Sequence, residues 1–269
     1  NPQDGHEAQT AVSSEAALGY RVEGVSYAYD AMVGLNLQVP KLDIAPGERV
    51  AVLGRNGSGK TTLLKLLAGL ATPSAGSVRV GNVDMLQARP DWLRSVVGYL
   101  PQAPRLFAGT LRDNLALGLS MPDENDIAEA AKLTGLDTLI AQHPRGLDLK
   151  ITEGGLGLSV GQRQLVALTR LVLQKPKVWL LDEPASALDQ DTEARLLAFL
   201  QGLGSQVTII YTTHQNSWLK LATRVLMVDG GKIAADVPAE RARMMTETQA
   251  KAMGAQAATK VEVSSEGKS

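Results

Sequence analysis

The sequence predicts an α/β fold in which helices cover a parallel β-sheet. Three short apolar runs have the length and continuous hydrophobicity of strands that are buried on both faces. They span residues 49–53, 177–182 and 206–211. Three helical patterns alternate with these runs, and such alternation is typical of a parallel sheet with crossover helices. The helical patterns cover residues 60–69, 162–173 and 192–200.

Two other regions are predicted to add to this core. Strand-like segments and a turn signal at Gly81-Asn82 indicate a small antiparallel sheet packed beside it. These segments lie at residues 20–29, 48–53 and 77–86. Residues 110–150 are mostly helical in pattern, so we expect an inserted helical subdomain at about 103–164. Its helices are predicted at 110–117, 125–134 and 136–142.

The folded domain is predicted at residues 19–236. Residues 1–18 hold three acidic residues and no Lys or Arg, and we interpret them as a linker. Because the chain begins at Asn1 rather than Met, we expect it to be a piece of a longer protein. Residues 237–269 are predicted to form a helix at 239–253 and then a polar tail. No apolar stretch approaches the about 20 residues that a membrane-spanning helix needs.

The composition excludes several classes of protein. The chain of 269 residues has 27 Lys and Arg against 28 Asp and Glu, a net charge of -1. A near-neutral chain is a poor candidate for binding nucleic acid, which requires a basic surface. The absence of cysteine excludes a disulfide scaffold, a cysteine nucleophile and a thiolate metal site. The three histidines, His6, His143 and His214, lie too far apart for metal-ligand spacing.

A glycine-rich loop follows the first predicted core strand and opens a helix. It matches the pattern G-x-x-x-x-G-K-[ST], and this context is the one that a phosphate-binding loop requires. Backbone N–H groups of such a loop surround phosphate oxygens, and the helix N-terminus adds partial positive charge. The sequence therefore predicts a P-loop NTPase fold of the RecA-like type. The loop comprises Gly54, Arg55, Asn56, Gly57, Ser58, Gly59, Lys60 and Thr61, and Thr62 follows it.

The second core strand ends on two carboxylates, Asp182 and Glu183. Ligands of parallel α/β sheets lie at the carboxyl ends of the strands. Asp182 is therefore a candidate ligand for Mg²⁺, and Glu183 can orient an attacking water. In the loop, Lys60 is expected to contact the β- and γ-phosphates and the Thr61 hydroxyl to bind Mg²⁺.

Taken in order, these motifs make the chain resemble the nucleotide-binding domain of an ABC transporter. Leu158-Ser-Val-Gly-Gln162-Arg-Gln164 is similar to the LSGGQ signature of that family. Asp182-Glu-Pro-Ala-Ser-Ala-Leu-Asp189 is similar to the end of its Walker B strand and its D-loop. The resemblance covers residues 20–236. It implies ATP and Mg²⁺ as cofactors and ATP hydrolysis as the reaction.

The resemblance also implies roles for single residues. Gln102 matches the Q-loop glutamine, which senses the γ-phosphate and Mg²⁺, and His214 matches the switch histidine. Tyr29 matches the aromatic residue that stacks on adenine, with Tyr27 as an alternative. The expected catalytic residues are Glu183, His214, Gln102 and Lys60. The expected metal ligands are Thr61, Gln102 and Asp182.

A head-to-tail dimer is a further implication. Ser159, Gly161 and Gln162 begin a predicted helix whose N-terminus suits an anion, and in the family it faces the ATP of a second copy. Arg55 and Asp189 are expected near this seam. Val160 departs from the family, which usually has glycine there. A β-branched residue resists positive φ and close backbone approach, so either the site does not need that freedom or it is weakened.

Two segments, at residues 106–115 and 151–157, resemble ABC exporters. This implies a transmembrane domain on the same full-length chain and a location at the cytoplasmic face of the bacterial inner membrane. The run at 169–184 is similar to type I secretion ATPases, which implies a protein substrate, a periplasmic adaptor and an outer-membrane channel. The alternatives are a hydrolysis-impaired ATP switch, a non-transport ABC ATPase and a small-molecule kinase, although a kinase would not need residues 158–164.

Overall fold

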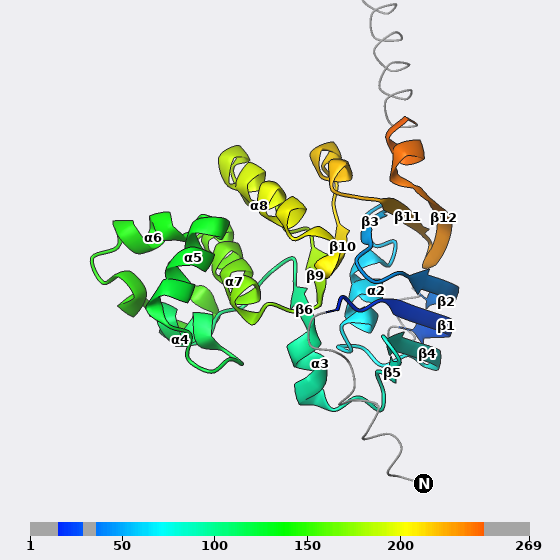
Figure 1. Cartoon of the computed structure of the whole chain (residues 1–269), viewed down its shortest axis with the longest axis horizontal. Coiled ribbons are helices and arrows are strands. Elements are labelled where there is room, and N and C mark those ends of the chain that lie inside the picture. The colour runs from blue at the N-terminus through cyan, green and yellow to red at the C-terminus, as the bar shows by residue number, and fades with distance from the viewer. Residues whose placement is uncertain (1–15, 29–35, 245–269) are drawn as a thin grey trace, which may run out of the picture.

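The computed structural model describes residues 16–28 and 36–244. A ten-stranded sheet runs through the middle of the molecule, in the order β5-β4-β1-β2-β12-β11-β3-β10-β9-β6 (Figure 1). Its central strands pair in parallel, which confirms the predicted α/β fold. These strands are β6 (Val97–Leu100), β9 (Val178–Asp182), β10 (Thr208–Thr212), β3 (Arg49–Leu53) and β11 (Arg224–Asp229).

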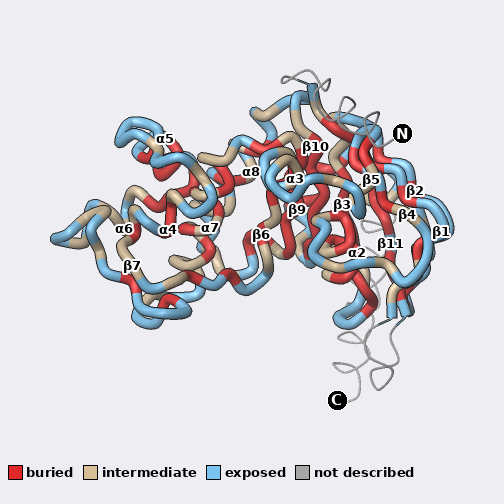
Figure 2. Tube along the Cα trace, turned by 90° about the horizontal axis from the view of Figure 1, so that it is seen from below, coloured by how far each residue is buried: buried red, intermediate tan, exposed pale blue. Residues whose placement is uncertain are grey.

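Successive side chains of a strand point to opposite faces of the sheet, so the apolar core strands present apolar side chains on both faces. Helices cover both faces and bury these side chains. On one face, Val50 and Val52 join a cluster with the leucines of α2 (Lys60–Leu67). On the other face, Ala51 joins a cluster with α7 (Val160–Gln174) and α8 (Gln190–Gly202). Figure 2 shows buried residues gathered along the central strands β3, β9 and β10.

The predicted antiparallel strands are present, and they continue the same sheet as the parallel core, which they join where β12 pairs with β2. Residues 48–53 belong to the parallel core, and the partner of β1 is β2, which the sequence analysis did not identify. Pro40 obscures β2 in the sequence. The strand tolerates it because Pro40 lies opposite Gly24, where the pairing of β1 with β2 is interrupted between Glu23–Lys41 and Val25–Val39. These strands are β1 (Tyr20–Ala28), β2 (Asn36–Ile44), β4 (Ala75–Val80), β5 (Val83–Asp84) and β12 (Lys232–Pro238).

The helical subdomain has an apolar cluster of its own, which includes Leu111, Ile127 and Leu136. It lies apart from the strands, at the left of Figure 1. The predicted boundary at 164 falls inside α7, because Val166 packs in this cluster while Leu168 packs against the sheet. The subdomain contains α4 (Leu111–Ala116), α5 (Glu124–Thr134), α6 (Leu136–Gln142), β7 (Gly109–Thr110) and β8 (Lys150–Ile151).

The predicted C-terminal boundary at 236 also falls inside an element, because β12 continues to Pro238. Residues 239–244 are helical, and Arg243 donates to the carbonyl oxygens of Leu219 and Ala222. The rest of the predicted helix at 239–253 lies outside the described residues. Within the described part of the chain, no helix has both the length and the apolar character needed to cross a bilayer. The remaining helix of the sheet layer is α3 (Pro90–Val96).

Candidate active site

The glycine-rich loop joins the end of β3 to the start of α2, as the sequence predicts. Gly59 precedes the helix with φ 112°, a left-handed conformation that side chains with a Cβ rarely adopt. A Cβ atom on Gly54 would lie only 2.1 Å from the carbonyl oxygen of Val228 in β11. The loop therefore follows this path because these positions are glycines.

Lys60 lies across the inside of the loop. Its ammonium group donates to the carbonyl oxygens of Gly54 at 2.8 Å and Arg55 at 3.1 Å, and the residue is 6% exposed. Burial lowers the pKa of Lys60, while the nearby charges of Glu183 and Asp182 raise it. A cation held in this way among acceptors is suited to receive an anion in front of the loop.

Asp182 is the last residue of β9 and is 1% exposed. Its Oδ1 accepts a 2.6 Å hydrogen bond from the Thr212 hydroxyl. Its Oδ2 is buried and has no hydrogen-bond partner among the described residues. Burying a carboxylate oxygen without a partner costs folding free energy unless a cation or its bound water occupies the position. Oδ2 of Asp182 is therefore suited to be a ligand of Mg²⁺.

Glu183 contacts the two residues that match the family's Q-loop glutamine and switch histidine. Its Oε1 lies 3.0 Å from His214 Nε2, and its Oε2 accepts from Gln102 Nε2 at 3.3 Å. The Glu183 backbone has φ 49°, an unusual value for a residue with a side chain. Strained backbone of this kind is concentrated at active sites, where the surrounding structure holds it in place.

These groups line one cavity of about 290 Å³. The cavity unites the loop and the start of α2 with the end of β9 and with two loops that follow β6 and β10. Asp182 lies buried beside it rather than in its wall, and the backbone of Gly54, Arg55 and Ser58 forms the loop behind Lys60. Tyr29 lies outside the described residues. The wall comprises Asn56, Gly57, Gly59, Lys60, Thr61, Thr62, Gln102, Glu183 and His214.

The signature residues do not line this cavity; they cap the first turn of α7. The Ser159 hydroxyl accepts from the Gln162 N–H at 3.1 Å, and Gln162 Oε1 accepts from the Ser159 N–H at 2.9 Å. This reciprocal pair is a capping box, which secures the helix N-terminus. The first residues of α7 therefore lie outside the wall of the cavity that the phosphate loop lines.

Val160 and Gly161 have different surroundings. Val160 is the first residue of α7 and is 51% exposed, and only Lys175 and Glu183 have positive φ among the described non-glycine residues. The concern that a β-branched residue must resist positive φ there is therefore removed. A Cβ on Gly161, in contrast, would lie 2.5 Å from the carbonyl oxygen of Ala187. Close packing requires glycine at 161 and not at 160.

Two polar residues at this site were not found by sequence reasoning. Thr212 contacts both carboxylate residues, and Gln164 Nε2 donates to the backbone oxygen of Glu183 at 3.0 Å. Both side chains belong to fully buried residues. For Thr212 the available signal was a polar residue at the carboxyl end of a buried strand, but the sequence does not show that β10 lies beside β9.

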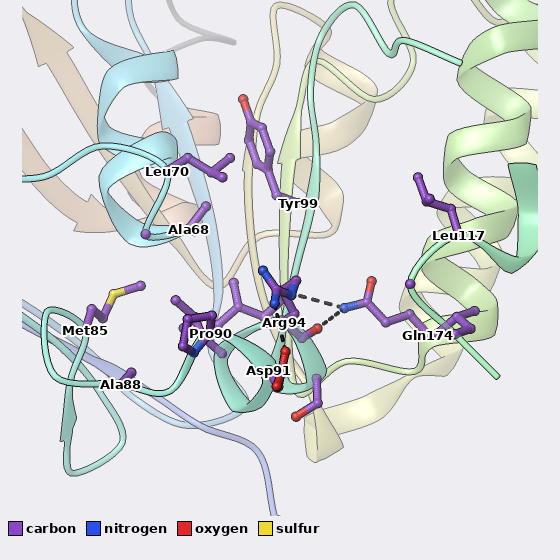
Figure 3. Close-up of a pocket in the computed structure, with 16 residues that line it drawn as sticks. Ala68, Leu70, Met85, Ala88, Pro90, Asp91, Arg94, Tyr99, Leu117 and Gln174 are labelled. Atoms are coloured by element: carbon purple, nitrogen blue, oxygen red, sulfur yellow. Dashed lines mark hydrogen bonds and ion pairs between the residues drawn. The ribbon is translucent and has the colours of Figure 1, made fainter. Parts of the chain in front are cut away.

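A second, larger hollow of about 830 Å³ separates the sheet region from the helical subdomain. Figure 3 shows Leu70, Met85 and Pro90 on one side of it and Leu117 on the other. Leu70 is 63% and Leu117 is 50% exposed, so apolar side chains face solvent here. Gln174 of α7 donates to the backbone oxygen of Arg94 in α3. The groove therefore lies where the two subdomains are joined.

Comparisons with known proteins agree with this geometry. A family model described as "ABC transporter" matches residues 37–186. A putative export ATP-binding/permease protein of Rickettsia felis is 31% identical over 86% of this chain and 40% of its own length. A mycobactin import ATP-binding/permease protein of Mycolicibacterium thermoresistibile is 38% identical over 72% of this chain and 33% of its own length.

A lactococcin transport/processing ATP-binding protein of Lactococcus lactis is 36% identical over 72% of this chain and 27% of its own length. The solved structure of a bacterial Atm1-family ABC exporter with ATP bound has a TM-score of 0.80 and 29% identity, over 90% of this chain and 42% of that chain. The chain thus spans less than half the length of these relatives. Because the family model covers more than half of the chain, the chain belongs to the ABC transporter family and is an ABC ATPase domain.

Proposed function

We propose that this chain binds and hydrolyses ATP to energise export by a longer ABC transporter. The observation that carries the proposal is the single cavity in which the phosphate loop meets Glu183, Gln102 and His214. A phosphate loop alone binds nucleotide; a carboxylate held beside it adds a group that can orient water for in-line attack. The alternative of a hydrolysis-impaired switch is less well supported because Glu183 and His214 are both in place.

Each residue has a role that its position supports. Lys60 turns from the Gly54 and Arg55 carbonyl oxygens to the β- and γ-phosphates, and loop N–H groups bind the same phosphates. Thr61, Asp182 and Gln102 would hold Mg²⁺, which would supply the charge neutralisation that phosphoryl transfer needs. Glu183 accepts a proton from the attacking water, and His214 donates to the γ-phosphate.

A second copy of the chain would complete each site. Ser159 and the Gly161 amide of the partner are placed at a helix N-terminus, where backbone N–H groups favour an anion. The pairing is head to tail, so each copy supplies its phosphate loop to one site and its signature to the other. ATP binding closes the pair, and hydrolysis with phosphate release reopens it.

The groove between the two subdomains is the proposed contact for a transmembrane domain. Its exposed apolar side chains, Leu70 and Leu117, lie where a helix of another domain could bury them. Relatives named as ATP-binding/permease proteins are more than twice as long as the matched region. Under this proposal the chain lies at the cytoplasmic face of the membrane.

The test is ATP turnover with Mg²⁺ measured against protein concentration. We expect the specific rate to rise with concentration, because two chains complete a site. Glu183→Gln should abolish turnover while ATP still binds, and Glu129→Gln, on the exposed side of α5, is the matched control. Near-normal turnover in Glu183→Gln would overturn the role of Glu183.

Absence of turnover in the unaltered chain, despite tight ATP binding, would favour the hydrolysis-impaired switch or a need for the membrane domain. Val160→Gly separates these outcomes: recovery of turnover would identify the signature as the cause. The finer assignment to type I protein secretion rests on the run at 169–184. A relative named for lactococcin transport supports it and one named for mycobactin import does not, so cargo-stimulated turnover of the full-length chain is the deciding measurement.

A further inference from the structure

Thr212 lies between the two acidic residues of the site. It is the last residue of β10 and pairs in register with Asp182, the last residue of β9. Its hydroxyl donates to Asp182 Oδ1 at 2.6 Å and accepts from the Glu183 backbone N–H at 2.8 Å. The residue is fully buried. One hydroxyl group therefore contacts the carboxylate that fits Mg²⁺ and the backbone of the carboxylate beside the phosphate loop.

The direction of these hydrogen bonds is determined by the partners. A backbone N–H can only donate, so the Thr212 oxygen must accept from Glu183, and its single proton is left for Asp182. A hydroxyl donating to an ionised carboxylate forms a short, strong bond. Because Oδ1 of Asp182 is engaged in this way, Oδ2 is the oxygen left without a partner among the described residues.

The same hydroxyl helps to hold the unusual backbone of Glu183. That residue has φ 49°, and both of its peptide groups are bound by side chains. Thr212 accepts from its N–H, and Gln164 donates to its carbonyl oxygen at 3.0 Å. Holding the backbone at this φ sets the direction of the side chain, which reaches Gln102 and His214.

We propose that Thr212 is a positioning residue for ATP hydrolysis, which orients Asp182 toward Mg²⁺ and Glu183 toward the attacking water. The inference rests on the proposed ATPase function. Loss of the Thr212 hydroxyl should lower the affinity of the site for Mg²⁺. Loss of a hydroxyl that only stabilises the fold would not have this specific effect. Groups that orient metal ligands change metal affinity or activity by about 10- to 100-fold when they are removed.

The chain contains a close structural control on the same strand. Thr208 begins β10, is fully buried, accepts from the Gly47 N–H at 2.8 Å and donates to the Leu18 carbonyl oxygen at 2.7 Å. Like Thr212, it accepts from a backbone N–H and donates once, but to a backbone carbonyl oxygen instead of a carboxylate, at the end of the strand away from Asp182. Thr208→Val reports what the loss of such a hydroxyl does to the fold alone.

The experiment compares Thr212→Val, Thr212→Ser and Thr208→Val in the whole chain. For Thr212→Val we expect a half-saturating Mg²⁺ concentration and a kcat that are each worse by about 10-fold or more, with the KM for ATP changed by less than about 3-fold. Thr212→Ser keeps the hydroxyl and should restore both. Thr208→Val should leave both unchanged. Thr212→Ala is a second variant without the hydroxyl, and the same result is expected if the valine variant does not fold.

A binding measurement makes the test independent of turnover. We expect Mn²⁺ to bind the ATP-loaded Thr212→Val protein about 10-fold more weakly than the unaltered protein, as read by electron paramagnetic resonance. Unchanged Mn²⁺ affinity in folded Thr212→Val or Thr212→Ala, or an equal loss in Thr208→Val, would overturn the inference. Failure of the proposed function gives a different pattern: Glu183→Gln would then turn over ATP like the unaltered chain.

Discussion

Replacing Gly161 by alanine tests the finding that the signature glycine is required by packing within the chain. The new Cβ would lie 2.5 Å from the Ala187 carbonyl oxygen, about 0.9 Å inside ordinary van der Waals contact. Overpacking of this kind typically costs about 1–3 kcal/mol. Alanine in a helix, however, gains up to about 1 kcal/mol over glycine, and less in the first turn. We therefore expect Gly161→Ala to lower the free energy of unfolding by about 1–2 kcal/mol.

The assay is urea unfolding followed by circular dichroism, with Val160→Ala as the control. Val160 occupies the neighbouring position and is exposed, so its replacement should change the free energy of unfolding by less than about 0.5 kcal/mol. The sign of the change in the free energy of unfolding distinguishes overpacking from the gain in helix propensity. If alanine at 161 stabilised the chain, the gain in helix propensity would have won, and the close contact with Ala187 would not constrain this position.

Two other predictions concern separate parts of the molecule. The Tyr20 hydroxyl donates to the buried carbonyl oxygen of Leu67 at the end of α2, at 2.7 Å, and burial raises the pKa of Tyr20. Tyr20→Phe leaves that carbonyl without its partner and should cost about 1–3 kcal/mol in urea unfolding; no measurable loss would contradict the account. Leu117→Glu places a charge in the groove proposed to contact the membrane domain, and should uncouple ATP turnover from transport in the full-length protein. Leu133→Glu, exposed outside that groove, is the control, and equal transport by the two variants would refute the docking assignment.

Three strands of the parallel core, β3, β9 and β10, were predictable because each has a mostly apolar, buried centre. β9 and β10 are fully buried along their length, and both were found from the sequence. Four strands of the ten-stranded sheet were missed, and two of them, β6 and β11, belong to the parallel core. β6 has only four residues, and Met227 and Asp229 of β11 are exposed, so both have weaker signals. β2 contains Pro40, and only alternate residues are buried over much of its length, while no residue of β12 is fully buried. Such strands are recognised by their pairing partners, which a single sequence does not display.

The candidate site divides in the same way. The phosphate loop and the pair Asp182-Glu183 were predicted from local residues, because their chemistry depends on adjacent positions in the chain. Gln102 was assigned to the site only by family resemblance. It donates to Glu183, but 81 residues separate the two in the chain, so no local pattern connects them. Thr212 was not predicted, because its role depends on β10 lying beside β9.

The class of the fold, the phosphate loop and the carboxylates at the end of β9 could be read from the amino-acid sequence without the structure. These features follow from local patterns: periodic hydrophobicity, glycines at a turn and charge at a strand end. The contacts between elements were needed to show that position 161 rather than 160 requires glycine, how Glu183 is held and which oxygen of Asp182 has no partner among the described residues. Those properties arise where β9, β10 and α7 meet, and contacts between segments far apart in the chain leave no pattern in any one of them.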